Sequence, residues 1–278
     1  MSIETTHVQA GAHRLEVSVF GQGVPAVVIE PAFGGSAESW LSIANTLATE
    51  TTVVTYDRAP YGSSSRAQDD RTPIQIAQDL HSVLDALGID HPVVLVGHSA
   101  GGVYVRAFAG LYSRQVAGMV LVDSAHEAQE QVRGLLPWRT AVLEALTLPL
   151  LRIAPSAMLN GADRRSMIRE FRASKRLTAA DQPLASGGLG DRPLIVLTRG
   201  PGAKTPESRS WRLWHGLHED LAGLSTNHRH IVAHSPDHYL HKSEPELVVT
   251  AIRDVLNSVE QQTHLSKAPT IDVPRGSA

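Results

Sequence analysis

The pentapeptide at residues 97–101, Gly-His-Ser-Ala-Gly, has residue types and a spacing that suit nucleophilic chemistry. An apolar run precedes it and a helical pattern follows it, so Ser99 is predicted on a sharp turn from a strand into a helix. Small residues two positions on either side of Ser99 suit such a turn, because it brings the strand and helix backbones close together. The helix start would also offer a backbone N–H and a positive dipole end to an oxyanion. The segment therefore predicts an exposed serine placed for attack on a carbonyl carbon.

The elements that must position this serine are strands and helices in alternation. Short apolar runs rich in β-branched residues are typical of strands covered on both faces; they lie at 26–29, 53–56, 93–96, 119–122 and 194–197. Residues 13–20 alternate polar and apolar side chains, as in a half-buried strand. Helical periods lie between the runs, one of them at 74–87 before Gly88. This order predicts an α/β fold with a mostly parallel central sheet flanked by helices.

One connection between the predicted strands is unusually long. About 70 residues separate the runs that end at 122 and begin at 194, far more than one crossover helix needs. We interpret residues 125–190 as a helical cap inserted after the sixth strand, with helices around 138–153 and 163–173. The core would then comprise residues 1–124 and 191–261, with a final helix at 247–259. Residues 262–278 lose the pattern and are predicted to be a disordered tail.

Composition excludes several classes of protein. The chain of 278 residues has 25 basic and 28 acidic side chains, and a net charge of −3 gives no reason to expect a nucleic-acid or anionic-membrane partner. It has no cysteine, which excludes disulfides, thiolate metal sites and a cysteine nucleophile. No apolar stretch is long enough to span a bilayer, and the first residues lack the layout of a secretory signal. We expect a cytoplasmic protein that acts on a small molecule, of unknown oligomeric state.

Four segments resemble the α/β-hydrolase family, and the likeness extends over about residues 10–260. They are residues 26–40 (AVVIEPAFGGSAESW), 56–64 (YDRAPYGSS), 96–102 and 236–245 (PDHYLHKSEP). The resemblance implies the α/β-hydrolase fold and the chain order serine, acid, histidine. His238 would then be the general base that takes the Ser99 proton and returns it to the leaving group. These motifs are specific for the fold and are poor guides to the substrate.

The acid of this arrangement has two candidates. The family often places it just after the strand predicted here at 194–197, but that turn offers only Glu207, and late. Some members carry the acid at the end of the preceding strand, where this chain has Asp123. A carboxylate at the carboxyl edge of a parallel strand can hold the imidazole tautomer better than one on a loose turn. We favour Asp123, with Glu207 as the alternative; Asp123 could also be a simple turn residue.

The resemblance also locates an oxyanion hole. When this segment is aligned with the family at Trp40, Pro31 and Ala32 occupy the positions where the family commonly has a His-Gly pair. The two backbone N–H donors would come from Phe33 and Ala100. Backbone donors do not depend on the side chain, so the departure need not impair the hole.

Four nearby polar residues receive structural interpretations. Asp57 and Arg58 precede the nucleophile in the chain, and we expect Arg58 to tie loops beneath the site. His98 is expected to be a packed neighbour of the serine. Asp237, where the family commonly has glycine, is expected to be a solvated loop carboxylate, with tuning of the imidazole as the alternative.

Charged clusters elsewhere could bind ligands. Arginines on one cap helix form either a solvated face, which we favour, or a clamp for a substrate carboxylate: Arg164, Arg165, Arg169 and Arg172. Histidines gather late in the chain at His228, His230, His234, His238 and His241. Zinc sites usually show tight helical or finger spacing with a carboxylate or thiolate, and the chain has neither a phosphate loop nor a dinucleotide fingerprint. We therefore expect no metal and no cofactor.

Together these features predict a serine hydrolase that cleaves a carboxylic ester or lactone through an acyl-enzyme intermediate. A partly apolar cap favours a hydrophobic substrate. Other chemistry of the same fold stays open: thioester or C–C bond hydrolysis, perhydrolysis, or opening of a macrolide-type lactone. A non-catalytic small-ligand receptor is the alternative from another class. Epoxide hydrolases and haloalkane dehalogenases are disfavoured, because they carry aspartate where Ser99 stands.

Overall fold

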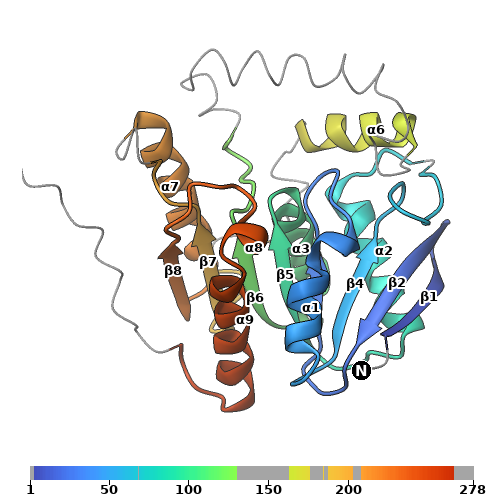
Figure 1. Ribbon diagram of the computed structural model, residues 1–278, viewed down its shortest axis with the longest axis horizontal. Helices are drawn as coiled ribbons and strands as arrows, with labels where there is room; N and C mark the ends of the chain where they lie inside the picture. Colours follow the sequence, from blue (N-terminus) through green and yellow to red (C-terminus); the bar gives the residue numbers. More distant parts are fainter. Residues whose placement is uncertain are drawn as a thin grey trace, which may run out of the picture.

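The computed structural model describes residues 3–67, 69–129, 163–175, 184, 187–202 and 208–265. Within these residues one eight-stranded sheet forms the centre of the molecule, in the order β1-β2-β4-β3-β5-β6-β7-β8 (Figure 1). Strand β2 pairs antiparallel with both β1 and β4, and the remaining neighbours are parallel. The strands are β1 Ile3–Ala10, β2 His13–Phe20, β3 Val27–Glu30, β4 Val53–Asp57, β5 Val93–His98, β6 Val116–Val122, β7 Leu194–Thr198 and β8 His228–Val232.

Helices cover both faces of the sheet, as predicted. On β5, Val93 and Leu95 enter one apolar cluster and Val94 and Val96 the other, so a continuous apolar run supplies both faces. The first cluster includes residues of α2 (Pro73–Ala86), α3 (Ala100–Leu111) and α7 (Arg209–Ala222). The second includes residues of α1 (Leu41–Leu47) and α9 (Pro245–Glu260). The shorter elements are η1 Ala37–Trp40, η2 Ser113–Gln115 and α8 Leu240–Ser243.

The six strands located by their apolar pattern correspond to β2 to β7, and the two at the sheet edges, β1 and β8, lie outside those predicted runs. Both are partly exposed, and the residues of β8 are all intermediate or exposed. An edge strand needs no continuous apolar run, which was the signal used for the inner strands. The predicted helix at 74–87 corresponds to α2, which begins with a capping box between Thr72 and Gln75. The predicted final helix lies within α9.

Helix α6 (Arg164–Lys175) overlaps the predicted helix at 163–173 and lies at the upper right of Figure 1. Its Met167 packs with buried Tyr61, and the rings of Phe171 and Phe33 are 5.7 Å apart. The helix therefore rests on the loops that follow β3 and β4. The other predicted cap helix, at 138–153, and residues 266–278 of the predicted tail lie outside the described residues. The prediction of disorder from residue 262 is wrong for the start of that tail, because Leu265 is buried and its N–H donates to Oδ1 of Asn227 at 2.9 Å.

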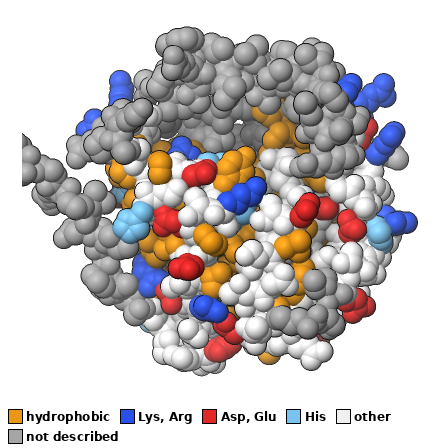
Figure 2. Space-filling view, viewed as in Figure 1, with side chains coloured by type: hydrophobic (Ala, Val, Ile, Leu, Met, Phe, Trp, Pro, Cys, Tyr) orange, Lys and Arg blue, Asp and Glu red, His pale blue; other side chains and the backbone are white. Residues whose placement is uncertain are grey.

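The surface seen from the side of Figure 1 carries acidic and basic side chains intermixed rather than one large field of a single sign (Figure 2). This mixture agrees with the small net charge of −3. In the part of the chain that the structure describes, no helix has both the length and the hydropathy that a bilayer span requires.

Candidate active site

Ser99 lies on the predicted turn between β5 and α3. Its backbone has φ 53° and ψ −118°, a strained conformation that non-glycine residues rarely adopt outside functional sites. A Cβ atom on Gly101 would lie 2.2 Å from the carbonyl oxygen of Glu30, and one on Gly97 would lie 2.6 Å from the Cα of Gly102. Both glycines are therefore required because the strand and helix backbones approach closely here, as expected from the sequence.

Asp123 follows β6, the neighbour of β5. The N–H of Ser99 donates to the carbonyl oxygen of Val122 at 3.1 Å, so the two strand ends lie side by side. Asp123 is fully buried and has φ 39°, in the left-handed region that aspartate tolerates better than most residues. His238 Nδ1 donates to its Oδ2 at 2.6 Å. The structure thus brings together the histidine and the favoured acid, which are 115 residues apart in the chain.

Three further N–H groups converge on the carboxylate of Asp123. Arg199 donates from Nη1 to Oδ2 at 2.8 Å and from its backbone to Oδ1 at 3.1 Å. Trp214 Nε1 donates to Oδ1 at 2.9 Å. Burial alone would raise the pKa of Asp123, but the hydrogen bond from His238 and the charge of Arg199 hold it well below its usual range. Asp123 is therefore ionised and fixed in orientation.

Arg199 and Trp214 are partners that the sequence analysis missed. Arg199 is the first residue after β7, which is where the family often has its acid. Its guanidinium carbon lies 4.8 Å from the centre of the Trp214 ring. A cation at the usual acid position was a signal that the acid lies elsewhere. Trp214 lies on α7 and carried no such signal. Glu207, the alternative acid, lies outside the described residues.

His98 contacts His238 from the elbow. Its Nε2 donates to the backbone oxygen of His238 at 2.9 Å, and the two rings are 4.8 Å apart. Burial, together with the neighbouring His238 and His241, lowers the pKa of His98 to about 3, so its ring is neutral near pH 7. The expectation of a packed elbow residue is confirmed. Asp237 is exposed, as expected, and accepts the N–H of Tyr239 at 2.9 Å.

Arg58 supports the loop predicted to form the oxyanion hole. Its guanidinium donates to the backbone oxygens of Pro31 and Ala32, both at 2.9 Å. It also pairs with two buried carboxylates, Glu30 at 2.5 Å and Glu170 of α6 at 3.0 Å. The expectation that Arg58 ties loops beneath the site is confirmed, and the same side chain joins α6 to the core.

The two backbone N–H groups predicted for the oxyanion hole belong to Phe33 and Ala100. Among the described residues neither N–H has a hydrogen-bond acceptor. The side chain of Phe33 packs against the apolar cluster that contains Ala100.

The arginines of α6 do not share one environment. Arg165 and Arg172 are exposed, as a solvated face requires. Arg169 is half-buried and its Nη1 donates to the backbone oxygen of Ala67 at 3.2 Å, so the solvated interpretation is wrong for this residue.

Comparisons with known proteins agree with the fold. The sequence model of the alpha/beta hydrolase fold family matches residues 25–188. The protein YqjL of Bacillus subtilis (strain 168) is 27% identical over 242 residues, covering 87% of each chain. A thermophilic esterase from Thermogutta terrifontis shares the fold with a TM-score of 0.64 and 22% identity, over 92% of this chain and 99% of that chain. The enol-lactonase from Burkholderia xenovorans LB400 has a TM-score of 0.68 and 16% identity, over 91% and 100%.

The family match spans more than half of the chain, and the sheet order and the turn at Ser99 agree with it. The chain therefore belongs to the α/β-hydrolase fold family.

Proposed function

We propose that the protein is a serine hydrolase that cleaves a carboxylic ester or lactone through an acyl-enzyme intermediate. Ser99 is the nucleophile, His238 the general base and Asp123 the residue that orients His238. The observation that carries this proposal is the 2.6 Å hydrogen bond between His238 and buried Asp123, at the strand end beside the strained turn of Ser99.

The tautomer of His238 follows from its partner. The ionised carboxylate of Asp123 can accept but not donate, so the hydrogen bond requires a proton on Nδ1 of His238. The lone pair is then on Nε2, which is the atom that takes the Ser99 proton. Arg199 and Trp214 act as positioning residues, because they hold the carboxylate of Asp123 and need not touch the substrate.

The reaction would proceed in two halves. His238 removes the Ser99 proton while Oγ of Ser99 bonds to the substrate carbonyl carbon. The resulting oxyanion accepts hydrogen bonds from the backbone N–H groups of Phe33 and Ala100. The C–O bond to the alcohol breaks, and His238 returns the proton to that leaving oxygen. Water activated by His238 then attacks the acyl-enzyme and releases the acid and Ser99. For a lactone the leaving oxygen stays attached, and the product is one hydroxy acid.

Aromatic side chains beside the site favour an apolar substrate group. Phe33 adjoins both the cluster of Ala100 and the ring of Phe171 on α6. Tyr61 and Met167 are buried in the same contact between loop and helix. An acyl or alcohol group that reaches the oxyanion donors would therefore meet hydrophobic surface.

A series of p-nitrophenyl esters and aliphatic lactones of increasing chain length tests this function. The expected result is sustained turnover by wild type, a preference for longer apolar chains, and loss of turnover in Ser99→Ala. A single turnover followed by tight retention of ligand would instead support a receptor. Unchanged turnover in Ser99→Ala would refute the proposal.

A further inference from the structure

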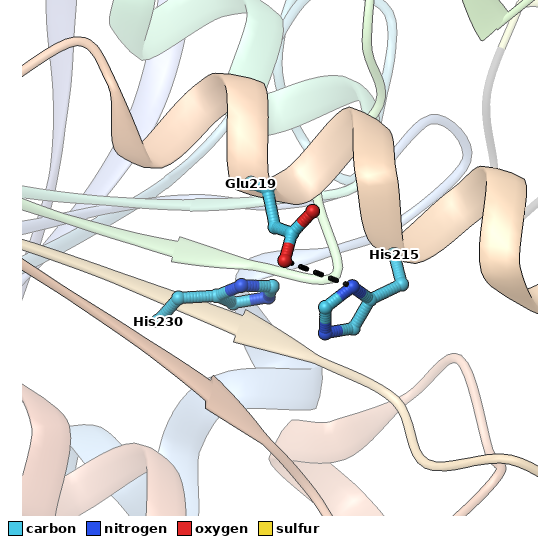
Figure 3. Close-up of side chains that lie close together, drawn as sticks. All are labelled: His215, Glu219 and His230. Atoms are coloured by element: carbon cyan, nitrogen blue, oxygen red, sulfur yellow. Dashed lines mark ion pairs between the residues drawn. The ribbon is translucent and has the colours of Figure 1, made fainter. Parts of the chain in front are cut away.

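Outside the candidate active site, two imidazoles and a carboxylate converge between α7 and the edge strand β8. They are His215 and Glu219 of α7 and His230 of β8 (Figure 3). One potential ligand atom from each side chain lies within 4.8 Å of the other two. The set mixes nitrogen and oxygen donors, which a simple acidic surface cluster does not.

Helix and sheet geometry explain the convergence. His215 and Glu219 are one helical turn apart and face the same side, with Nδ1 of His215 3.5 Å from Oε1 of Glu219. Strand β8 pairs with β7, over which α7 packs, and the rings of His215 and His230 are 4.7 Å apart. His215 and His230 are half-buried and Glu219 is exposed, so solvent reaches the cluster from the carboxylate side.

A chain of hydrogen bonds sets the tautomer of His230. His218 Nε2 lies 2.9 Å from the backbone oxygen of Ser124, which can only accept, so His218 carries its proton on Nε2. In the neutral ring Nδ1 then carries no proton and accepts the hydroxyl proton of Thr198 at 2.6 Å. The Thr198 oxygen must then accept from Nε2 of His230, also at 2.6 Å.

His230 is therefore left with a lone pair on Nδ1. Histidines that bind metal ions commonly donate their other ring N–H to an acceptor in this way, which fixes the ring and its tautomer.

We propose that His215, Glu219 and His230 bind one divalent transition-metal ion of the Zn²⁺ type. Two imidazoles and one carboxylate suit such ions, and water would complete the coordination. A bound ion would fasten β8 to α7, and β8 leads into the loop that carries His238. The proposal differs from the sequence expectation of no metal, which considered the late histidines alone and not His215 or Glu219. It does not depend on the proposed hydrolase function.

Isothermal titration of the chelator-treated protein with ZnCl₂ tests the site. His215→Gln and Glu219→Gln change partly or largely exposed positions of α7, so folding should be retained. The matched control is His81→Gln, because His81 and Asp85 form the same one-turn pair at 3.4 Å on α2 without belonging to a three-ligand group among the described residues. We expect one tight Zn²⁺ site in wild type and in the control, weakened at least tenfold in each α7 variant.

Two further readouts separate this site from chance binding by other histidines. Zn²⁺ should raise the Tm of wild type and of His81→Gln, but not of His215→Gln or Glu219→Gln. Thr198→Val removes the acceptor of His230 Nε2 and should weaken Zn²⁺ binding by about 10–100-fold with all three ligands present. The proposal is overturned if wild type binds no Zn²⁺, if affinity is unchanged in both α7 variants, or if binding is lost in His238→Ala instead.

Discussion

An asparagine at position 123 would place an amide where four N–H groups converge, from His238, Trp214 and the side chain and backbone of Arg199. The amide has one accepting oxygen. If that oxygen serves Trp214 and the Arg199 backbone, the NH₂ group faces His238 Nδ1. His238 would then move its proton to Nε2 and could no longer accept the Ser99 proton. If the amide is flipped, two fixed N–H donors lose their acceptor instead.

The size of the effect follows from this exchange of tautomer. We expect kcat of Asp123→Asn to fall by about 10²–10⁴, equivalent to about 3–5 kcal/mol of transition-state stabilisation. KM should change little, because Asp123 is buried behind His238 and does not reach the substrate.

The assay is steady-state hydrolysis of the best p-nitrophenyl ester, with near-ultraviolet circular dichroism as the check on folding. Glu207→Gln is the matched control, since it neutralises the other candidate acid, and it should retain wild-type kcat. Near wild-type activity in Asp123→Asn together with a large loss in Glu207→Gln would refute the assignment.

Three other results are expected. The pKa of Asp123 is held below its ordinary 3.8, so its ionised carboxylate stabilises the fold above that pH, and this contribution is lost as the pH falls. The free energy of unfolding in urea, measured in acid, should therefore depend less on pH in Asp123→Asn than in wild type. Glu170→Ala removes one of the two carboxylate acceptors of buried Arg58, while Glu30 still balances its charge, and urea unfolding should register a loss of about 1–3 kcal/mol, against no measurable loss if the contact is unimportant. Gly101→Ala forces the carbonyl oxygen of Glu30 to shift and should lower the free energy of unfolding by about 1–3 kcal/mol. Gly216→Ala, which has open space around it in α7, should raise that free energy by up to about 1 kcal/mol. Thermal unfolding measures both, and equal effects would contradict the packing argument.

The features predictable from the sequence are those that depend on short-range pattern. The apolar run of β5, the glycines around Ser99 and the helix start at Ala100 are adjacent in the chain, so one segment encodes both the turn and its packing. The inner strands were found for the same reason. The edge strands β1 and β8 lie outside the predicted apolar runs because an edge is defined by what lies beside it, and half-exposed strands tolerate polar residues.

Contacts between distant segments set the limit of the sequence prediction. Asp123 and Glu207 could not be separated with certainty, because the choice depends on which carboxylate meets His238. Arg199 reaches Asp123 across 76 residues and Trp214 reaches it across 91. Likewise, the spacing of His215 and Glu219 is visible in the sequence, but their approach to His230 depends on how α7 packs over the sheet.

The central claim is that Ser99 is a nucleophile activated by His238, and covalent labelling tests it directly. The protein is treated with a fluorophosphonate, and intact mass and peptide mapping locate the adduct. We predict one phosphonyl group on the peptide that contains Ser99 in wild type, none in Ser99→Ala, and a much slower reaction in His238→Ala. Absence of labelling in folded wild type, or an adduct that persists in Ser99→Ala, would contradict the account.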